Sequence, residues 1–119
     1  MRYALVALQL IAACSGSREH APPKPAPPPA ALRIVAAKTD TVRAAAHEVL
    51  ARRCGECHER HRPTANPKAL QIFDLDAPDW PARFDEHRFG AALMRLKAPP
   101  AEDAAKFVAF RDAELAARR

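Results

Sequence analysis

The chain has few of the residues that usually hold a small domain together. Only three of its 119 residues are cysteines, and two of these, Cys54 and Cys57, are separated by two residues. A disulfide between them would close too small a loop to add much stability, so a disulfide framework is excluded. A domain of this size then needs a cofactor or another group to support its core.

The sequence also lacks the basic stripe with interspersed aromatic residues that nucleic-acid binding requires. The formal net charge is +5, but the 19 basic and 14 acidic residues are mixed along the chain. We therefore predict no nucleic-acid partner. The charge fits a solvated surface, or a docking patch for an acidic protein.

The apolar run near the N-terminus is too short to cross a bilayer. It covers residues 3–13, follows Arg2 and is interrupted only by Gln9, which is the form of a secretory signal. The run closes on "LIAAC", which resembles the lipobox of bacterial lipoproteins. That resemblance implies cleavage before Cys14 and lipidation of Cys14, and Ser15 slightly favours the outer membrane. The alternative is an ordinary signal segment with a cysteine there by chance.

A proline-rich stretch separates this segment from the rest of the chain. Residues 21–30, "APPKPAPPPA", hold six prolines in ten positions, which favours a stiff polyproline II spacer over a packed structure. After a lipidated cysteine such a spacer acts as a tether. We therefore divide the chain into a signal segment at residues 1–14, a tether at residues 15–32 and one folded domain at residues 33–119.

The domain shows helical patterns and no convincing strand, so we predict an all-α fold. Helices are expected at residues 39–53, 84–97 and 101–117. Thr39 or Asp40 can cap the first of them, which runs directly into Cys54. The loop between the first two has four expected buried anchors: Leu70, Ile72, Phe73 and Leu75. The spacing in the last helix predicts an inner face, with Phe110 beside it: Ala104, Phe107, Val108, Arg111 and Leu115.

The stretch "CGECH" at residues 54–58 contains the residues best suited to bind a cofactor. Cys54, Cys57 and His58 match C-x-x-C-H, the attachment signature of c-type haem. The two thiols are spaced to reach the two vinyl groups on one edge of a porphyrin, and the histidine that follows is the proximal ligand of the iron. These thioether bonds form outside the cytoplasm, which agrees with the secretory signal. The sequence thus predicts one covalently bound haem c.

Two other kinds of site use the same residues. A zinc site would add His61 to the two cysteines and His58, but zinc sites normally draw ligand pairs from separated segments, and His58 directly follows Cys57. A redox dithiol is usually preceded by a strand within a βαβ unit, whereas here a helix precedes the motif and a loop follows it. Both alternatives fit the sequence less well than haem does.

With this motif in place, residues 39–119 resemble the class I cytochrome c family. The shared pattern is a helix leading into "CGECH", a proline-containing loop, a middle helix and a C-terminal helix with aromatic residues. The resemblance implies a small fold of three to four helices packed around one haem, with the first and last helices crossing. It also implies that a backbone carbonyl near a proline holds His58, and Pro63 and Pro67 are the candidates.

The second axial ligand of the iron is less clearly marked. The family analogy asks for a methionine before the last helix, and Met94 is the only methionine left after the signal segment is removed. It falls in the predicted middle helix, on the face that also carries His87 and Ala91. Met94, His87 and an open coordination position therefore remain alternatives, and Met94 also fits an ordinary filler residue.

Together these features predict a lipid-anchored monohaem c-type cytochrome at the periplasmic face of a cell envelope. It would be an electron carrier rather than an enzyme, exchanging single electrons with redox partner proteins through an exposed haem edge. No small-molecule substrate is indicated. One alternative is a haem sensor or weak peroxidase with an open distal position. Another is a lipoprotein whose haem is structural and whose tether presents it to a larger complex.

Overall fold

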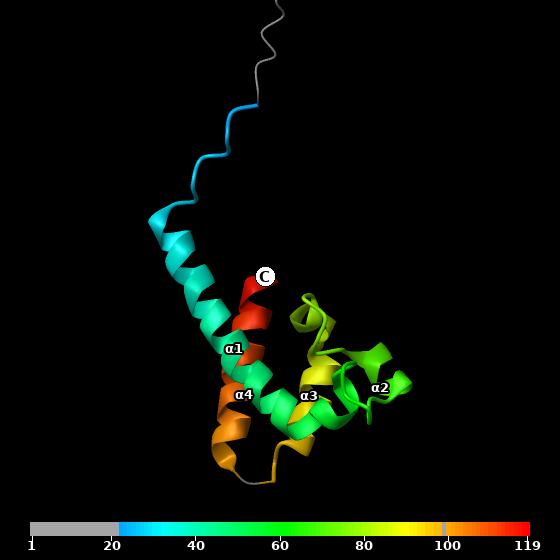
Figure 1. The fold of residues 1–119 in the computed structure, drawn as a ribbon. Coiled ribbons are helices and arrows are strands. Elements are labelled where there is room, and N and C mark those ends of the chain that lie inside the picture. Colours follow the sequence, from blue (N-terminus) through cyan, green and yellow to red (C-terminus); the bar gives the residue numbers. More distant parts are fainter. Residues whose placement is uncertain (1–21, 99) are drawn as a thin grey trace, which may run out of the picture.

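The structure is a computed structural model that describes residues 22–98 and 100–119 (Figure 1). Its elements are the α-helices α1 (Ala30–His58), α2 (Pro67–Ile72), α3 (Glu86–Arg95) and α4 (Ala101–Ala117), with a 3₁₀ turn at Trp80–Arg83. No strand occurs in these two ranges, which confirms the predicted all-α class. Within the same ranges, no helix is both long and apolar enough to span a membrane. The predicted signal segment and Cys14 lie outside the described residues.

The first helix, α1, is longer at both ends than the helix predicted at residues 39–53. Thr39 was a candidate for its N-cap, but the Thr39 hydroxyl donates to the carbonyl of Val35 at 3.0 Å, as a residue inside a helix does. The alanine-rich residues before Thr39 have high helix propensity, so the helix begins at Ala30, directly after the proline run. It thus begins within the stretch assigned to the tether, of which residues 22–29 are exposed and not helical.

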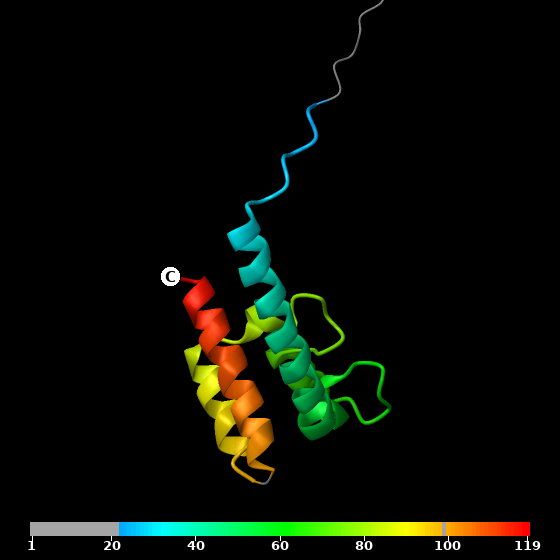
Figure 2. The same ribbon diagram turned by 90° about the vertical axis from the view of Figure 1, so that its left-hand side faces the viewer.

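The helices form a small bundle with the C-x-x-C-H motif at one end. α4 runs antiparallel to α1 and makes the most extensive helix pair with it, and α3 packs beside α4 (Figures 1 and 2). α2 and the loops around it lie at the C-terminal end of α1 (Figure 1). The bundle thereby fixes the position of the last turn of α1, which carries the motif.

The core is built around aromatic side chains. Phe84 is fully buried, and its ring centroid lies 5.4 Å from that of Phe89 and 5.6 Å from that of Phe107, in tilted and edge-on arrangements. One continuous cluster contains the buried apolar residues: Ala46, Val49, Leu50, Phe73, Leu75, Trp80, Phe84, Phe89, Ala92, Leu96, Phe107 and Phe110. The domain therefore has an apolar core made from α1, α3, α4 and the long loop.

The buried face of α4 differs from the predicted one. Phe107 is fully buried as expected, but Asp103 and Glu114 are also buried, whereas four residues of the predicted face are only half-buried: Ala104, Val108, Arg111 and Leu115. Phe110 lies in the core itself. Both carboxylates pair with arginines of α1, Arg52 with Asp103 at 2.5 Å and Arg43 with Glu114 at 2.5 Å. Apolar spacing alone did not reveal this face, because charge pairing is what allows these carboxylates to be buried.

The long loop and α3 follow the prediction more closely. Phe73 and Leu75 are buried and Leu70 is half-buried, but Ile72 is 45% exposed, so its predicted role as a buried anchor is wrong. Ile72 is the last residue of α2, a short helix with no buried side chain. α3 falls inside the predicted residues 84–97, and the Asp85 side chain caps its first turn.

Candidate functional site

The motif occupies the last turn of α1. Cys57 and His58 follow Cys54 by three and four residues, so the helix places all three side chains on neighbouring positions of one side. Cys54 is half-buried and Cys57 is exposed, and both are free thiols. The three predicted haem-attachment residues are therefore together, with the more exposed thiol facing solvent.

His58 is the buried member of the motif, with 7% of its surface exposed. Its Nδ1 lies 3.0 Å from the backbone carbonyl of Phe73, and because a carbonyl only accepts, Nδ1 is the protonated nitrogen that donates. The imidazole also stacks on the Phe73 ring, with centroids 3.7 Å apart and planes 4° from parallel. The ring is therefore fixed in plane and tautomer, and its Nε2 carries the lone pair that can bind a metal.

The segment Phe73–Leu75 is joined to the end of α1 by two hydrogen bonds. Beside the His58–Phe73 bond, the Leu75 N–H donates to the His58 carbonyl at 2.8 Å. The segment is itself held by the Arg60 Nε, which donates to the Asp74 carboxylate at 2.6 Å. The carbonyl that holds His58 thus belongs to Phe73 and not to a residue beside Pro63 or Pro67, where the family resemblance suggested it.

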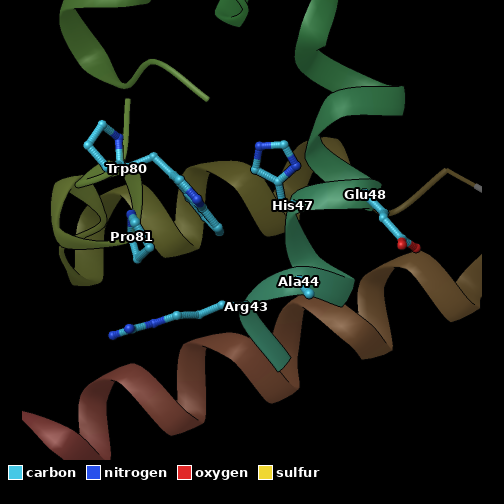
Figure 3. A pocket seen from close by; sticks show the side chains of 7 residues that line it. Arg43, Ala44, His47, Glu48, Trp80 and Pro81 are labelled. Atoms are coloured by element: carbon cyan, nitrogen blue, oxygen red, sulfur yellow. The ribbon is translucent and has the colours of Figure 1, made fainter. Parts of the chain in front are cut away.

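His47 is a supporting residue that the sequence did not indicate. It is half-buried in α1, and its Nε2 donates to the Leu75 carbonyl at 3.0 Å. Its ring also meets Trp80 edge-on, with centroids 5.5 Å apart. Figure 3 shows both side chains at a cavity of about 470 Å³, with Glu48 pointing away from Trp80. No side chain of the motif lines this cavity.

The surroundings of Cys54 differ from those of a typical redox-active thiol. Burial raises the pKa of the Cys54 thiol, although the nearby charges of Arg95 and Arg53 act in the opposite direction. The thiolate is the nucleophile in disulfide exchange, and redox-active cysteines accordingly have a lowered pKa. A raised pKa lowers the thiolate fraction of Cys54, which makes it a weaker nucleophile than a typical redox-active cysteine. Arg53, directly before Cys54, donates from Nη2 to the Ala98 carbonyl at 3.2 Å, so the segment after α3 lies close to the motif.

The four ligands of the alternative zinc site do not come together. The His61 Nδ1 lies 2.9 Å from the Asp76 carboxylate, and this histidine is exposed. Across residues 22–98 and 100–119, no group of three or more His, Cys, Asp and Glu side chains is arranged to hold a metal ion. The donors near the motif therefore offer one histidine, as a haem iron needs on its proximal side, rather than a tetrahedral set.

The His61–Asp76 contact predicts a pH dependence of stability. Hydrogen bonds from the side chain and backbone of His61 lower the pKa of the Asp76 carboxyl from its ordinary value of 3.8. A depressed folded-state pKa contributes stability above pH 3.8, and this contribution is lost as the pH falls through the lower folded value. Asp76→Asn should therefore destabilise the domain at neutral pH, with the difference shrinking in acid. Urea unfolding across this pH range measures it, and a pH-independent difference would contradict the assignment.

The two candidate distal ligands lie on an uncovered face of α3. Met94 is 63% exposed, and His87 and Ala91 are exposed beside it. A Cβ added to Gly90 would meet no atom within 4 Å, so this face has open space in front of it. In the described residues, no hydrogen bond or ring contact joins His87 to His58. The face is available to a bound group, but neither candidate is held in a ligand position.

Comparison with known proteins adds no further identification. No family model, no curated protein and no solved structure matches the chain. The function is therefore argued from the residues and geometry of the chain itself.

Proposed function

We propose that the chain is a monohaem c-type cytochrome that carries single electrons, anchored by a lipidated Cys14 at the periplasmic face of a cell envelope. The observation that supports this most is the arrangement of His58. Its buried ring donates from Nδ1 to the Phe73 carbonyl, which leaves Nε2 for a metal, directly after the unpaired Cys57. Ligand histidines are typically held by such a backbone acceptor.

The residues present suit a covalently bound haem c. Cys54 and Cys57 would form the thioether bonds, and Nε2 of His58 would be the proximal ligand of the iron. The uncovered face of α3, with open space at Gly90, is free to receive a flat group. The segment that follows α3 lies near the motif, since Arg53 donates to the Ala98 carbonyl at 3.2 Å.

The chain would hold the group and leave its edge accessible. When bound, haem c supplies reversible one-electron chemistry at its iron. The Phe73–Leu75 segment would keep the His58 ring in one orientation, and the buried aromatic core would limit water on the protein side. The exposed Cys57 would put the attachment edge at the surface, where redox proteins can dock transiently. Such transfer needs no catalytic side chain, so we propose a carrier rather than an enzyme.

The exposure of Met94 favours a second candidate function. With 63% of its surface exposed, Met94 is not held against the rest of the domain, and an iron without a distal ligand would be open to gases or peroxide. The second candidate is therefore a haem sensor or weak peroxidase. A bound methionine would raise the reduction potential and a second histidine such as His87 would lower it.

Carbon monoxide binding to the reduced protein separates the two candidates. If Met94 is the distal ligand, the parent protein should resist carbon monoxide, Met94→Ala should bind it readily, and His87→Ala should behave like the parent. The two substitutions are matched, because both remove an exposed side chain from the same face of α3. Ready binding by the parent protein would instead favour the sensor or peroxidase, and resistance lost only in His87→Ala would assign that histidine.

A further inference from the structure

The N-terminal end of α1 extends beyond the rest of the bundle. Figures 1 and 2 show its first turns projecting past the C-terminal end of α4, and every residue from 30 to 38 is exposed. Three large apolar side chains stand on this short projection: Leu32 is 59% exposed, Ile34 70% and Val35 62%. A few isolated helical turns are only marginally stable in water, and Leu32 and Val35 lie three residues apart on one face, where exposed apolar side chains usually mark a contact surface.

A groove continues from this projection onto the bundle. It has a volume of about 530 Å³ and lies between the N-terminal half of α1 and the C-terminal half of α4. Its walls carry small and apolar residues with a few polar ones: Val35, Lys38, Thr39 and Val42 from α1, and Ala109, Asp112, Ala113, Ala116 and Ala117 from α4. The groove lies away from the motif, so its occupancy does not depend on the proposed haem.

The spacing along α1 indicates that the occupant is a helix. Six residues follow one another at alternating intervals of three and four, the pattern of a helix–helix seam: Leu32, Val35, Thr39, Val42, Ala46 and Val49. Ala46 and Val49 are fully buried against the bundle, whereas Leu32 and Val35 of the same seam are exposed. The seam is therefore covered in its C-terminal part and open in its N-terminal part.

The charges of the groove favour a second copy of this chain over other helices. Lys38 stands on the α1 wall and Asp112 on the α4 wall. Within the described residues Asp112 pairs with its neighbour Arg111 at 2.8 Å and forms no salt bridge with Lys38. In a two-fold dimer each surface meets its own copy, so a contact between Lys38 of one chain and Asp112 of the other would be made twice, once from each chain. A membrane surface fits less well, because Leu32 and Ile34 are two residues apart and point to opposite sides of the helix.

We propose that two copies of this chain associate through this groove, with the open seams of their α1 helices packed in parallel and Lys38 of each facing Asp112 of the other. In this arrangement Val35 lies near the two-fold axis and Ile34 points away from it. Both proline-rich segments leave the dimer at the same end, which the direction of residues 22–29 in Figure 1 allows.

Disulfide trapping in the full chain, expressed with a covalent haem-attachment pathway, tests whether the α1 helices of two copies pack through the open seam. Val35→Cys and Ile34→Cys form a matched pair, because Ile34 is the more exposed of the two and would be favoured by random collision. We expect a cross-linked dimer with Val35→Cys on a non-reducing gel, and no more than the background of the unsubstituted chain with Ile34→Cys. Equal trapping of the two variants, or no trapping by Val35→Cys, would overturn the proposal.

Charge reversal in the Val35→Cys background tests the pairing. Lys38→Asp or Asp112→Lys alone places like charges opposite each other in the dimer, so each should lose most of the cross-linked product. The double reversal restores opposite charges, and it should restore the cross-link. Both positions are exposed. Asp112→Lys also removes the pair with Arg111 inside its own chain, but the double variant keeps that loss, so a restored cross-link reports the contact between chains. A double variant that stays as poor as the single ones would overturn the proposed arrangement.

Discussion

Replacing His58 with alanine should abolish the native spectrum of the matured protein, while replacing His61 with alanine should leave that spectrum intact. His58 and His61 are three residues apart in the sequence and differ in their surroundings. His58 is buried and its Nδ1 donates to the Phe73 carbonyl, whereas His61 is exposed and contacts the Asp76 carboxylate. Of the two, His58 is the one whose ring is buried, stacked on Phe73 and held by a backbone carbonyl with Nε2 left for a metal, as the proximal ligand of a haem iron requires.

The measurement is the absorption spectrum of each variant, oxidised and reduced, after expression with a covalent haem-attachment pathway. A haem stain on a denaturing gel shows separately whether Cys54 and Cys57 still hold the group. If His58→Ala loses the stain, covalent attachment also depends on the histidine. If His58→Ala keeps the stain but has an altered spectrum, the histidine is needed only to ligate the iron. A spectrum of His58→Ala equal to that of the parent, or the loss of the spectrum in His61→Ala, would contradict the assigned ligand.

Replacing Phe84 with alanine should cost about 3–5 kcal/mol in the free energy of unfolding. Phe84 is fully buried, and its ring meets the rings of Phe73, Phe89, Phe107 and Phe110 at centroid distances between 4.8 and 5.9 Å. Truncation would leave a cavity at the point where α3, α4 and the long loop join. For a domain this small, such a loss is comparable to its whole stability.

Ile72→Ala is the matched control for this core prediction. Ile72 is also a large apolar residue of the long loop region, but it is 45% exposed, so its truncation should change the free energy of unfolding by about 0.5 kcal/mol or less. Urea unfolding followed by helical circular dichroism measures both variants, and Phe84→Leu provides a milder variant if Phe84→Ala does not fold. Equal effects at positions 84 and 72 would show that the described core is wrong.

Several helices could be predicted from sequence because their signals are local. α4 matches the predicted residues 101–117, since Pro100 precedes it and acidic residues stand in its first turn. The start of α1 was missed, because Thr39 and Asp40 looked like caps while the alanine-rich residues before them continue the helix. The burial of Asp103 and Glu114 was missed for another reason: it depends on arginines of α1 that lie far away in the chain.

The candidate site was predictable only where a motif carries it. Cys54, Cys57 and His58 fall within five consecutive residues, so their spacing is visible in the sequence. The last turn of α1 then keeps the three side chains together. The partner of His58 was not predictable, because it is a backbone carbonyl of Phe73, and carbonyls have no sequence signature. The role of His47 depends in the same way on the carbonyl of Leu75, so no pattern in α1 could have indicated it.

The central claim is that Cys54 and Cys57 bind haem covalently, and one spectrum tests it directly. The full chain is expressed with a covalent haem-attachment pathway, denatured, extracted with acidic organic solvent to remove loosely bound haem, and its reduced absorption spectrum is recorded. We predict that the spectrum of haem c remains with the polypeptide and disappears in the Cys54→Ala, Cys57→Ala double variant. A polypeptide that retains no haem after extraction, from cells in which a known c-type cytochrome matures normally, would contradict the account.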